Sequence, residues 1–329
     1  MSAGAKPSDA AVFDAVAAVL MAAGVGDGQR LCCALSGGVD SVVLLDALAA
    51  LRERFGFDLS AAHVHHGLNP AADEWRAFCA DFCRRLDLPL HVFHVEVARD
   101  DPHGLEAAAR AARHAALASV DCDWLALGHQ RDDQAETVLF RLLRGAGVRG
   151  AAAMAAVEPG DGGRAGRLRP LLELGREEIV AHAHARALQW VEDASNASLE
   201  FARNDLRHRI LPAIEARFPA ARVTLARAAR HFRDASGLLD ELAALDAVSC
   251  AGANAGEFRR DALFGLNPAR QANLLRWEFS RRGAFAPSQA RLNEALRQLR
   301  DAARPLRFPL GDYALCYRRG RVWLEKTIP

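Results

Sequence analysis

The sequence predicts an α/β protein, in which a parallel sheet flanked by helices is followed by a smaller, mainly helical domain with a basic surface. In the first half, short apolar runs rich in β-forming residues alternate with longer segments of helical periodicity, which is typical of βαβ units. In the second half most strand-like runs stop and arginines become frequent along helical segments. We therefore expect two domains, residues 1–217 and residues 218–329.

Four apolar runs are the expected strands of the sheet, with helical segments between them. The runs are 29–35, 59–66, 88–97 and 123–129, and the helical segments are 39–54, 71–87, 104–119 and 133–144. An Ala-rich amphipathic stretch comes before the first run. It lacks the basic start and the clean apolar centre of a signal peptide, so we expect a surface helix there.

The chain beyond the fourth run changes character several times. A Gly- and Arg-rich stretch, 145–170, predicts a loop or hairpin, and helical patterns follow at 175–188 and 200–217. After Phe218-Pro219 the pattern is helical to about 245. A helix–turn–helix pattern then covers 261–301, and the final alternating stretch predicts a hairpin.

Composition narrows the class of protein. The 329 residues are 51% hydrophobic, which permits a large core, and no apolar run reaches the ~18 residues of a membrane span. Seven cysteines are scattered through apolar runs, which favours buried free thiols in a reducing compartment. Residues 1–200 carry 19 basic and 28 acidic side chains, whereas residues 201–329 carry 23 and 13. This asymmetry favours a polyanionic partner for the second half, although arginine-rich helix surfaces without a partner remain the alternative.

The junction of the first strand and the first helix is the most informative segment. It consists of Ser36, Gly37, Gly38, Val39, Asp40 and Ser41. Backbone N–H groups at a helix N-terminus, with two hydroxyls beside them, suit phosphate oxygens, and Asp40 offers a carboxylate to Mg²⁺. The lysine of a Walker loop is absent, since the only lysines are Lys6 and Lys326. A tight turn with capping side chains is the structural alternative.

A second polar cluster follows the fourth strand. His129 ends that run, and Asp132, Asp133 and Glu136 fall in the first turns of the next helix. Acidic residues stabilise a helix N-terminus through the dipole, so capping alone is one explanation. Because the first loop lies at a neighbouring strand end, a site for a metal ion or an amine is favoured over capping.

Two further clusters have weaker signals. His63, His65 and His66 crowd a strand end, where a zinc site, a structural role and a loop facing a nucleotide are all open; the spacing is poor for zinc, and we favour the nucleotide. Arg203 and Arg207 stand four residues apart on a helix and form a basic pair. Read alone, this segment is better explained as an ordinary capped helix.

Taken in order, these segments resemble a known family. The loop Ser36–Ser41 resembles the pyrophosphate-binding loop of the N-type ATP pyrophosphatases, also called the PP-loop superfamily. Over residues 29–217 the chain is similar to the tRNA(Ile)-lysidine synthetases. The matching segments are "HVHHGL", "EAAARAARHAAL", "LGHQRDDQAETVLFRLLRGAGVRG", "RPLL" and "EDASN…FARNDLRHRILP". The resemblance implies a PP-loop ATPase domain of the adenine-nucleotide α-hydrolase-like fold.

The resemblance also implies a reaction and its participants. ATP adenylates C2 of the wobble cytidine of the isoleucine tRNA with anticodon CAU, and free L-lysine then displaces AMP. It implies ATP and Mg²⁺ as cofactors, with Asp40 and Asp133 as metal ligands. Asp40, Asp133, Glu136 and Arg203 are the expected catalytic residues. ATP is expected to contact the loop residues Ser36 to Ser41 together with His65, His129, Arg110 and Arg113. Arg203 and Arg207 are expected to contact RNA.

Further expectations and rivals follow from the same resemblance. We expect a cytoplasmic enzyme, a homodimer, and the lack of the additional C-terminal domain that some members carry. A tRNA thiolase shares the loop, but its Cys-x-x-Cys pairs are missing here. Amidotransferase-type synthetases share the loop but have no need of a basic second half. A catalytically inactive nucleotide- or RNA-binding module would tolerate the loss of Asp40 and Ser41, and both are present.

Overall fold

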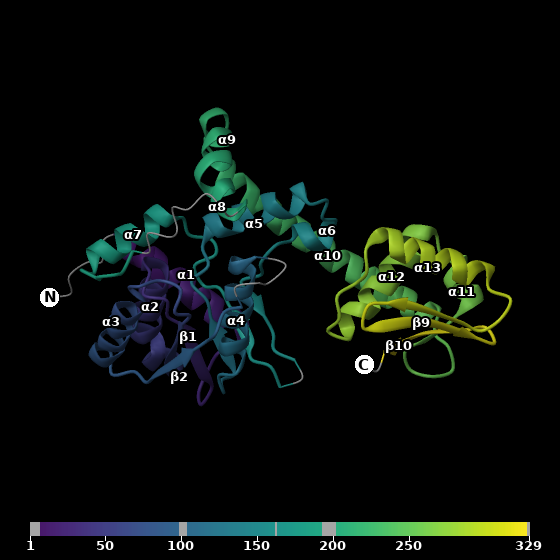
Figure 1. The fold of residues 1–329 in the computed structure, drawn as a ribbon, viewed down its shortest axis with the longest axis horizontal. Coiled ribbons are helices and arrows are strands. Elements are labelled where there is room, and N and C mark those ends of the chain that lie inside the picture. The colour runs from purple at the N-terminus through teal and green to yellow at the C-terminus, as the bar shows by residue number, and fades with distance from the viewer. Residues whose placement is uncertain (1–6, 99–103, 162, 193–201, 328–329) are drawn as a thin grey trace. The chain divides into compact units, whose positions relative to one another are not determined.

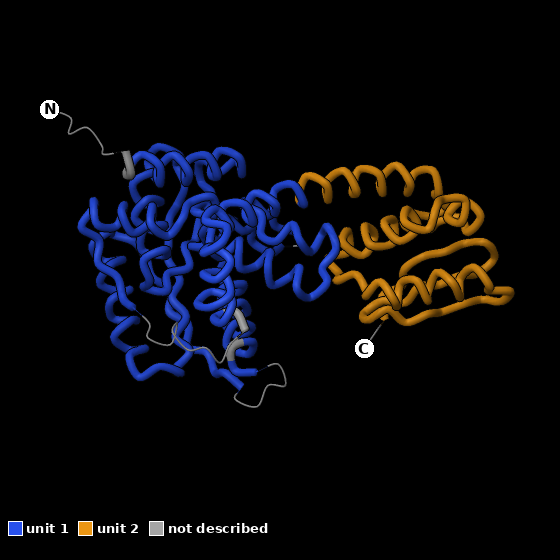
Figure 2. Tube along the Cα trace, turned by 90° about the horizontal axis from the view of Figure 1, so that it is seen from above, with its two compact units in different colours: residues 1–232 blue, residues 233–329 orange. Residues whose placement is uncertain are grey.

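The structure is a computed structural model that divides into two compact units. It describes residues 7–98, 104–161, 163–192 and 202–327 (Figure 1). The units are Met1–Phe232, called unit 1 here, and Arg233–Pro329, called unit 2 (Figure 2). They divide inside helix α10 (Ala221–Ser249), beyond the position that the sequence suggests, because the helix that starts after Pro219 runs on without a break. From the resemblance, residues 1–217 are expected to form the ATP-binding catalytic domain and residues 218–329 a basic tRNA-binding domain, and this assignment stays a prediction.

A six-stranded sheet forms the centre of unit 1, and it is parallel except at one edge. Its order is β3 (Leu90–His94), β2 (Asp58–His65), β1 (Arg30–Ala34), β4 (Trp124–Ala126), β6 (Gly166–Leu168) and β5 (Val157–Glu158). Only the β5–β6 pair is antiparallel. The four strands expected from the sequence are therefore confirmed as parallel neighbours, which fits the α/β class.

Helices cover both faces of this sheet. They are α1 (Pro7–Ala23), α2 (Val39–Phe55), α3 (Ala72–Arg85), α4 (Leu105–Ala118) and α7 (Arg176–Ala185). Two further helices, α5 (Arg131–Leu143) and α6 (Val148–Ala151), follow the carboxyl end of β4. Successive residues of β1 point to opposite faces, so Leu31 and Cys33 join the core under α1, α2, α3 and α7. Cys32 and Ala34 join a smaller core with Leu117 of α4. Burial on both faces explains why β1 reads as a continuous apolar run.

The stretch 145–170 holds more structure than a loop. It contains α6 and the β5–β6 hairpin, and β6 adds a parallel strand beside β4 that the sequence analysis did not anticipate. Gly166 of β6 lies against the ring of Trp124, so that a Cβ there would come within 2.3 Å of a ring carbon. The Trp124 ring fills the space that a side chain at position 166 would occupy, which explains how a Gly-rich segment can form a strand here.

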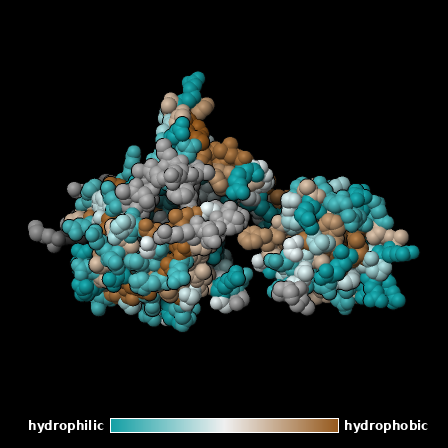
Figure 3. Space-filling model, viewed as in Figure 1, coloured by the Kyte–Doolittle hydropathy of each residue, from teal (hydrophilic) through white to brown (hydrophobic). Residues whose placement is uncertain are grey.

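The segment 202–249 is helical but not uniform. It consists of α8 (Ala202–Asp205), a π-helical stretch η2 (Leu206–Ile210), α9 (Leu211–Arg217) and α10. Pro212 has no N–H to donate back along the helix, which favours a local change of hydrogen-bond pattern before it. Apolar side chains are exposed where α9 ends and α10 begins, Phe218 and Val223 among them (Figure 3).

Unit 2 is a four-stranded antiparallel sheet with helices on one face. The elements are β7 (Glu257–Arg259), α11 (Arg260–Gly265), α12 (Pro268–Arg281), α13 (Gln289–Asp301), β8 (Leu306–Leu310), β9 (Tyr313–Arg318) and β10 (Arg321–Lys326). The sheet order is β7-β10-β9-β8. Phe279 and Leu292 of the helices pack on Leu315, Val322 and Leu324 of the strands. The expected helix–turn–helix is three helices, α11, α12 and α13. The final stretch, expected to be a hairpin, forms three strands, β8, β9 and β10, of a larger sheet.

Candidate active site

The loop between β1 and α2 is held in shape by two serine hydroxyls. The Ser41 hydroxyl donates to the Gly38 carbonyl oxygen over 2.9 Å and accepts from the Ser36 N–H over 3.2 Å. The two hydroxyl oxygens are 3.1 Å apart. Gly38 is the N-cap of α2, and no side chain caps the helix. The first turn of a 17-residue helix thus keeps its positive potential and its N–H groups for an anion.

Three glycines lie around this loop, and the surroundings of each would affect an added side chain differently. Gly37 has φ 90°, and a Cβ there would lie 2.8 Å from the Val191 side chain, so a larger residue at this position would strain the folded loop. A Cβ at Gly38 would meet only the Ser36 hydroxyl oxygen, at 3.6 Å. At Gly128, after β4, it would lie 3.2 Å from the backbone of Asp40. The close approach at Gly128 brings the start of α5 beside the start of α2.

Two cavities adjoin the loop and share Ser36, Gly38 and Val191 in their walls. The smaller, about 250 Å³, lies over the ends of β1 and β2 and is lined also by Leu35, His63, His65, His66, Trp75 and Arg113. The larger, about 590 Å³, is lined also by Asp40, Gln130, Asp132, Asp133, Arg176 and Arg207. Both lie beyond the carboxyl ends of parallel strands, where α/β sheets bind ligands.

Asp40 is the least satisfied carboxylate of the site. Its Oδ1 atom is buried without a hydrogen-bond partner, and its Oδ2 atom is 3.9 Å from the nearest guanidinium nitrogen of Arg176. Burial, followed by the charge of Asp133, raises the pKa of Asp40 to about 7. A carboxylate in this state has a strong tendency to take a cation.

The start of α5 combines a capping box with an ion pair. Gln130 is the N-cap: its side chain accepts from the Asp132 N–H over 2.9 Å, and Asp133 Oδ2 accepts from the Gln130 N–H over 3.1 Å. Asp133 Oδ1 accepts from Arg207 Nη2 over 3.0 Å. Asp133 therefore caps α5 and also lines the larger cavity. A role in holding a metal ion or an amine stays a prediction.

Glu136 is fully buried and lies behind the cavity wall rather than in it. Arg207 donates to both of its carboxylate oxygens, from Nε over 2.6 Å and from Nη2 over 3.1 Å. The hydrogen bonds to Glu136 raise the pKa of Arg207 even though burial opposes them. The guanidinium expected to contact RNA is thus engaged by two carboxylates, as part of the wall of the cavity.

The basic side of the site comes from α4 and the strand ends. Arg113 lines the smaller cavity; the surrounding protein and the charge of Arg110 lower its pKa. Burial, with the charges of Arg169 and Arg113, outweighs the attraction of Asp133 and lowers the pKa of His129 to about 3. His129 is therefore neutral at pH 7, and its Nδ1 is buried without a hydrogen-bond partner. Arg110 shares this positive environment.

In the described part of the chain no group of three potential metal ligands converges, so nothing at the histidine cluster supports the zinc alternative. His63 Nδ1 is 2.9 Å from the Leu35 carbonyl oxygen, and burial lowers the pKa of His63. His65 lies over the ring of His94, with a centroid distance of 4.8 Å. The three histidines of the cluster, His63, His65 and His66, all line the smaller cavity, as a nucleotide-facing position requires.

All seven cysteines are free thiols, and six of them are buried, as the sequence predicts. Burial raises the pKa of Cys32 to about 12 and that of Cys79 to about 12. Cys122, the partly exposed one, has a pKa of about 11 for the same reason. Since the thiolate is the reactive form, these residues are poor candidates for sulfur chemistry.

Several residues of the site gave no signal in the sequence. Arg176 opens α7 and faces Asp40, Arg222 of α10 is 3.3 Å from Asp132, and Trp75 closes the smaller cavity. Each lies far along the chain from the loop, and none belongs to a polar cluster. Arg203 falls in α8, but its side chain lies outside the described residues, so its place in the site stays a prediction.

Comparison with known proteins agrees with this geometry. Residues 14–214 match the model of the PP-loop domain, and residues 258–323 match the model of the TilS substrate binding domain. The tRNA(Ile)-lysidine synthase of an Azoarcus species is 57% identical over 310 residues, covering 94% of this chain and 68% of the relative. That of Aromatoleum aromaticum is 58% identical over 307 residues, with 93% and 71% covered.

Among solved structures, a U34-tRNA thiolase from Methanococcus maripaludis has a similar fold. Its TM-score is 0.58 at 19% identity, covering 67% of this chain and 78% of that one. At this identity the likeness shows a shared fold alone and does not extend to the reaction. The identity and coverage of the two synthases, with both domain matches, decide the family: the chain belongs to the tRNA(Ile)-lysidine synthases.

Proposed function

We propose that the chain uses ATP to join free L-lysine to C2 of the wobble cytidine of the CAU-anticodon isoleucine tRNA, releasing AMP and pyrophosphate. The tRNA so modified is read as isoleucine rather than methionine. The observation that carries the proposal is the unpartnered, buried carboxylate oxygen of Asp40 beside a loop of amides and hydroxyls with a cavity on each side. Membership of the PP-loop family and the absence of a loop lysine support ATP cleavage at the α-phosphate.

The two cavities suggest a division of labour in the first step. The smaller cavity, with Trp75 and the histidines, would take the nucleoside, and the larger one would take the RNA base. The cytidine C2 oxygen attacks the α-phosphorus, and the bond to pyrophosphate breaks. Negative charge grows on the pyrophosphate, where the Ser36 and Ser41 hydroxyls and the α2 N-terminus would stabilise it. Arg110 and Arg113 would hold phosphate oxygens.

Among the described residues, the Asp40 side chain has no hydrogen bond that would give it a structural role, and it is suited to bind Mg²⁺. Its free oxygen has no protein partner, and no third carboxylate, histidine or cysteine completes an all-protein site. Mg²⁺ commonly takes one or two carboxylates and fills its shell with phosphate oxygens and water. We propose Asp40 and Asp133 as its ligands. The ion would neutralise charge on the leaving phosphates.

The second step needs an amine that has lost a proton. The ε-amine of lysine attacks C2, the bond from C2 to the adenylate oxygen breaks, and AMP leaves. Asp133 lines the cavity and would orient the ammonium group or accept its proton. Glu136 does not line the cavity, so we propose that it acts through Arg207, which it holds beside Asp133. Arg203 is proposed to contact the reacting base or the tRNA.

Location and assembly are inferred from the reaction. No helix among the described residues is long and apolar enough to cross a membrane. We propose the cytoplasm, because the tRNA substrate and ATP are found there. A homodimer stays a prediction, which light scattering of the purified chain would check.

The decisive experiment follows radiolabelled lysine into tRNA. The chain is incubated with ATP, Mg²⁺, lysine and a transcript of the isoleucine tRNA, and the products are lysine in acid-insoluble RNA, AMP and pyrophosphate in equal amounts. A methionine tRNA transcript with the same anticodon is the control and should remain unmodified. AMP formation without tRNA, or sulfur incorporation into the RNA, would contradict the proposal.

A further inference from the structure

The exposed face of the unit 2 sheet carries arginines in a row. Arg321 of β10 pairs in register with Arg259 of β7 on one side and with Arg318 of β9 on the other. Residues directly opposite each other in an antiparallel pair project from the same face with neighbouring Cβ atoms, and like charges there repel. All three side chains are exposed. The fold therefore accepts an unfavourable interaction at this position.

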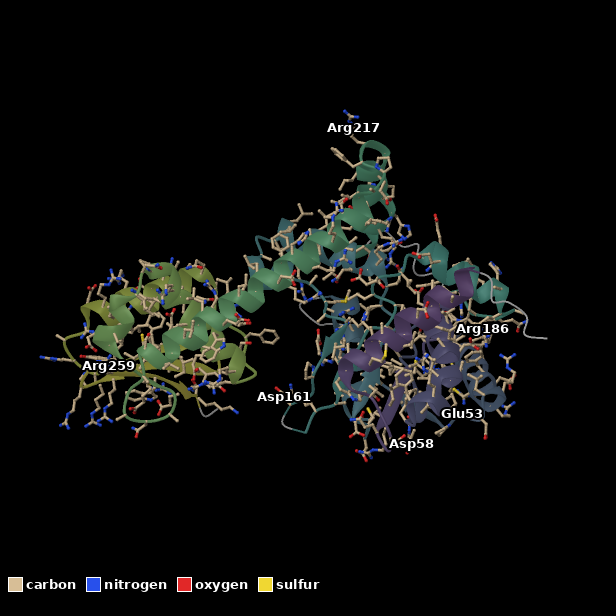
Figure 4. The ribbon with its side chains drawn as sticks, turned by 180° about the vertical axis from the view of Figure 1, so that it is seen from behind. Glu53, Asp58, Asp161, Arg186, Arg217 and Arg259 are labelled. Atoms are coloured by element: carbon tan, nitrogen blue, oxygen red, sulfur yellow. The ribbon has the colours of Figure 1, made fainter. Side chains whose placement is uncertain are left out.

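A fourth arginine continues the row in the β9–β10 turn. Arg319 has φ 49° and the following Gly320 has φ 81°. Two-residue turns with positive φ at both positions favour Asn-Gly or Gly-Gly, so arginine is a strained choice at the first one. Nitrogen-tipped side chains project from the sheet around the labelled Arg259 (Figure 4). A cation is thus kept where both backbone and electrostatics disfavour it.

Carboxylates near the row neutralise it only in part. The closest approaches are 3.7 Å between Arg321 and Glu257, and 3.6 Å between Arg259 and Asp261. Exposed pairs at such distances are weak. Arg318 and Arg319 have no ion pair among the described residues of unit 2. Meanwhile Val322 and Leu324, on the other face of β10, are buried in the core, so the arginine face cannot turn inward.

We propose that these four residues, Arg259, Arg318, Arg319 and Arg321, form an arginine row that binds the phosphate backbone of a double-stranded part of the tRNA. This inference rests on the proposed function and names the surface that the tRNA contacts. Guanidinium groups suit phosphate oxygens, and a row across three strands is about 10 Å wide, enough for successive phosphates.

The composition of the face favours backbone contact over base recognition. Proteins that hold single-stranded RNA stack its bases on aromatic side chains, whereas double-stranded RNA is bound mainly through phosphates and hydroxyls. Among the strand residues on this face, Trp323 is the one aromatic side chain, and it is only half-exposed. The row therefore fits a duplex stem better than an open loop.

The test compares two triple variants of the full chain with equal loss of charge. One is Arg259→Gln, Arg318→Gln and Arg321→Gln. The control replaces exposed arginines on α12 and α13 by Arg281→Gln, Arg291→Gln and Arg297→Gln. Affinity for the isoleucine tRNA transcript is measured by fluorescence anisotropy at a series of KCl concentrations.

The row variant should bind at least tenfold more weakly at about 0.1 M salt, with a slope of log affinity against log salt that is less steep by about 2. The control should change far less. The KM for tRNA should rise while kcat at saturating tRNA and the KM for ATP stay the same. A short RNA duplex should compete with tRNA for the wild-type row better than a single strand of equal length.

The stability of the row variant supplies a second readout. Removing like charges should leave the melting temperature unchanged or raise it at low salt. A lower melting temperature with wild-type tRNA affinity would overturn the proposal, because the row would then be structural. So would equal losses in both variants, or better competition by the single strand. If the wild-type chain makes no AMP with tRNA and lysine, the proposed function fails instead, whatever the row does.

Discussion

Both units contain a sheet with helices packed on it, but the parallel sheet of unit 1 is covered on both faces and the antiparallel sheet of unit 2 on one. In unit 1 polar groups can gather only at the edge where the strands end, so the loop Ser36–Ser41, Gln130 and Asp133 line one cavity. In unit 2 a whole face stays open, and its arginines lie in a row. The comparison teaches that the helices covering a sheet decide which kind of site it can form. A sheet covered on both faces forms an enclosed site suited to chemistry, whereas a sheet covered on one face offers an open site for a partner with a large surface.

The largest effect is expected from removing a carboxylate of the enclosed site in unit 1. Asp40→Ala should reduce lysine- and tRNA-dependent AMP formation by at least about 100-fold, since groups that stabilise developing charge contribute on that scale. Asp58→Ala is the matched control, an exposed carboxylate at the opposite end of the sheet, and should keep wild-type turnover. The rate of AMP release at saturating substrates is the measurement. Turnover of the Asp40 variant near the wild-type rate would refute the role of the loop.

The next prediction compares the loss of one buried ion pair in unit 1 with the loss of one in unit 2. Arg207→Gln leaves Glu136 buried and uncompensated, which should cost about 3–5 kcal/mol of folding free energy and most of the activity. Adding Glu136→Gln should restore stability without restoring activity. In unit 2, Arg270→Gln leaves Asp246 buried in the same way, and it should lower stability without changing the KM for ATP. Urea denaturation and ATP kinetics check both; a change in the KM for ATP from Arg270 would contradict the comparison.

A smaller effect separates folding from binding within the loop. Gly38→Ala has room for its Cβ and an ordinary backbone conformation, so the variant should fold normally but raise the KM for ATP roughly tenfold, the effect of about 1.4 kcal/mol. Gly37→Ala meets Val191 and needs a positive φ, so it should lower the melting temperature. Thermal unfolding and ATP kinetics on both variants distinguish the two. Equal melting temperatures of Gly37→Ala and the wild type would show that the Val191 side chain can move aside at little cost.

The last prediction concerns how the folding stability depends on pH. Because burial raises the folded pKa of Asp40 from 3.8 to about 7, ionising it penalises the folded state increasingly as the pH rises between those values. Asp40→Asn removes the penalty. The variant should be about as stable as wild type near pH 4 and more stable above pH 7, by up to about 4 kcal/mol for a shift of about three pKa units. Unfolding at a series of pH values measures this, and a constant difference would point to another cause.

The sequence was a good guide to elements whose signal is local. Four strands could be predicted because each is a short apolar run, and the loop after the first could be predicted from its glycines and hydroxyls. The strand β6 could not, since its three residues include Gly166 and owe their conformation to β4 and the ring of Trp124. The extent of the unit 2 sheet depends on β7, which is equally short.

For the site, residue types were predictable and their partners were not. Asp133 and Glu136 could be placed on one helix, but Arg207 reaches them from 74 and 71 positions away, which no spacing along the chain indicates. The expected contact of Arg207 with RNA stays a prediction. Arg176 gave no signal because its importance lies in facing Asp40 from another helix. Distant pairing of charges is a property of the folded chain, so a single sequence does not reveal it.

The burial of the native thiols has a practical consequence for fluorescence work. Maleimide dyes need a thiolate, and the cysteines with the highest pKa values will react slowly near pH 7. A cysteine introduced at an exposed position of each unit would therefore take a dye over a low background, without first replacing seven residues. Energy transfer between such dyes would then follow, molecule by molecule, whether the two units draw together when RNA is added.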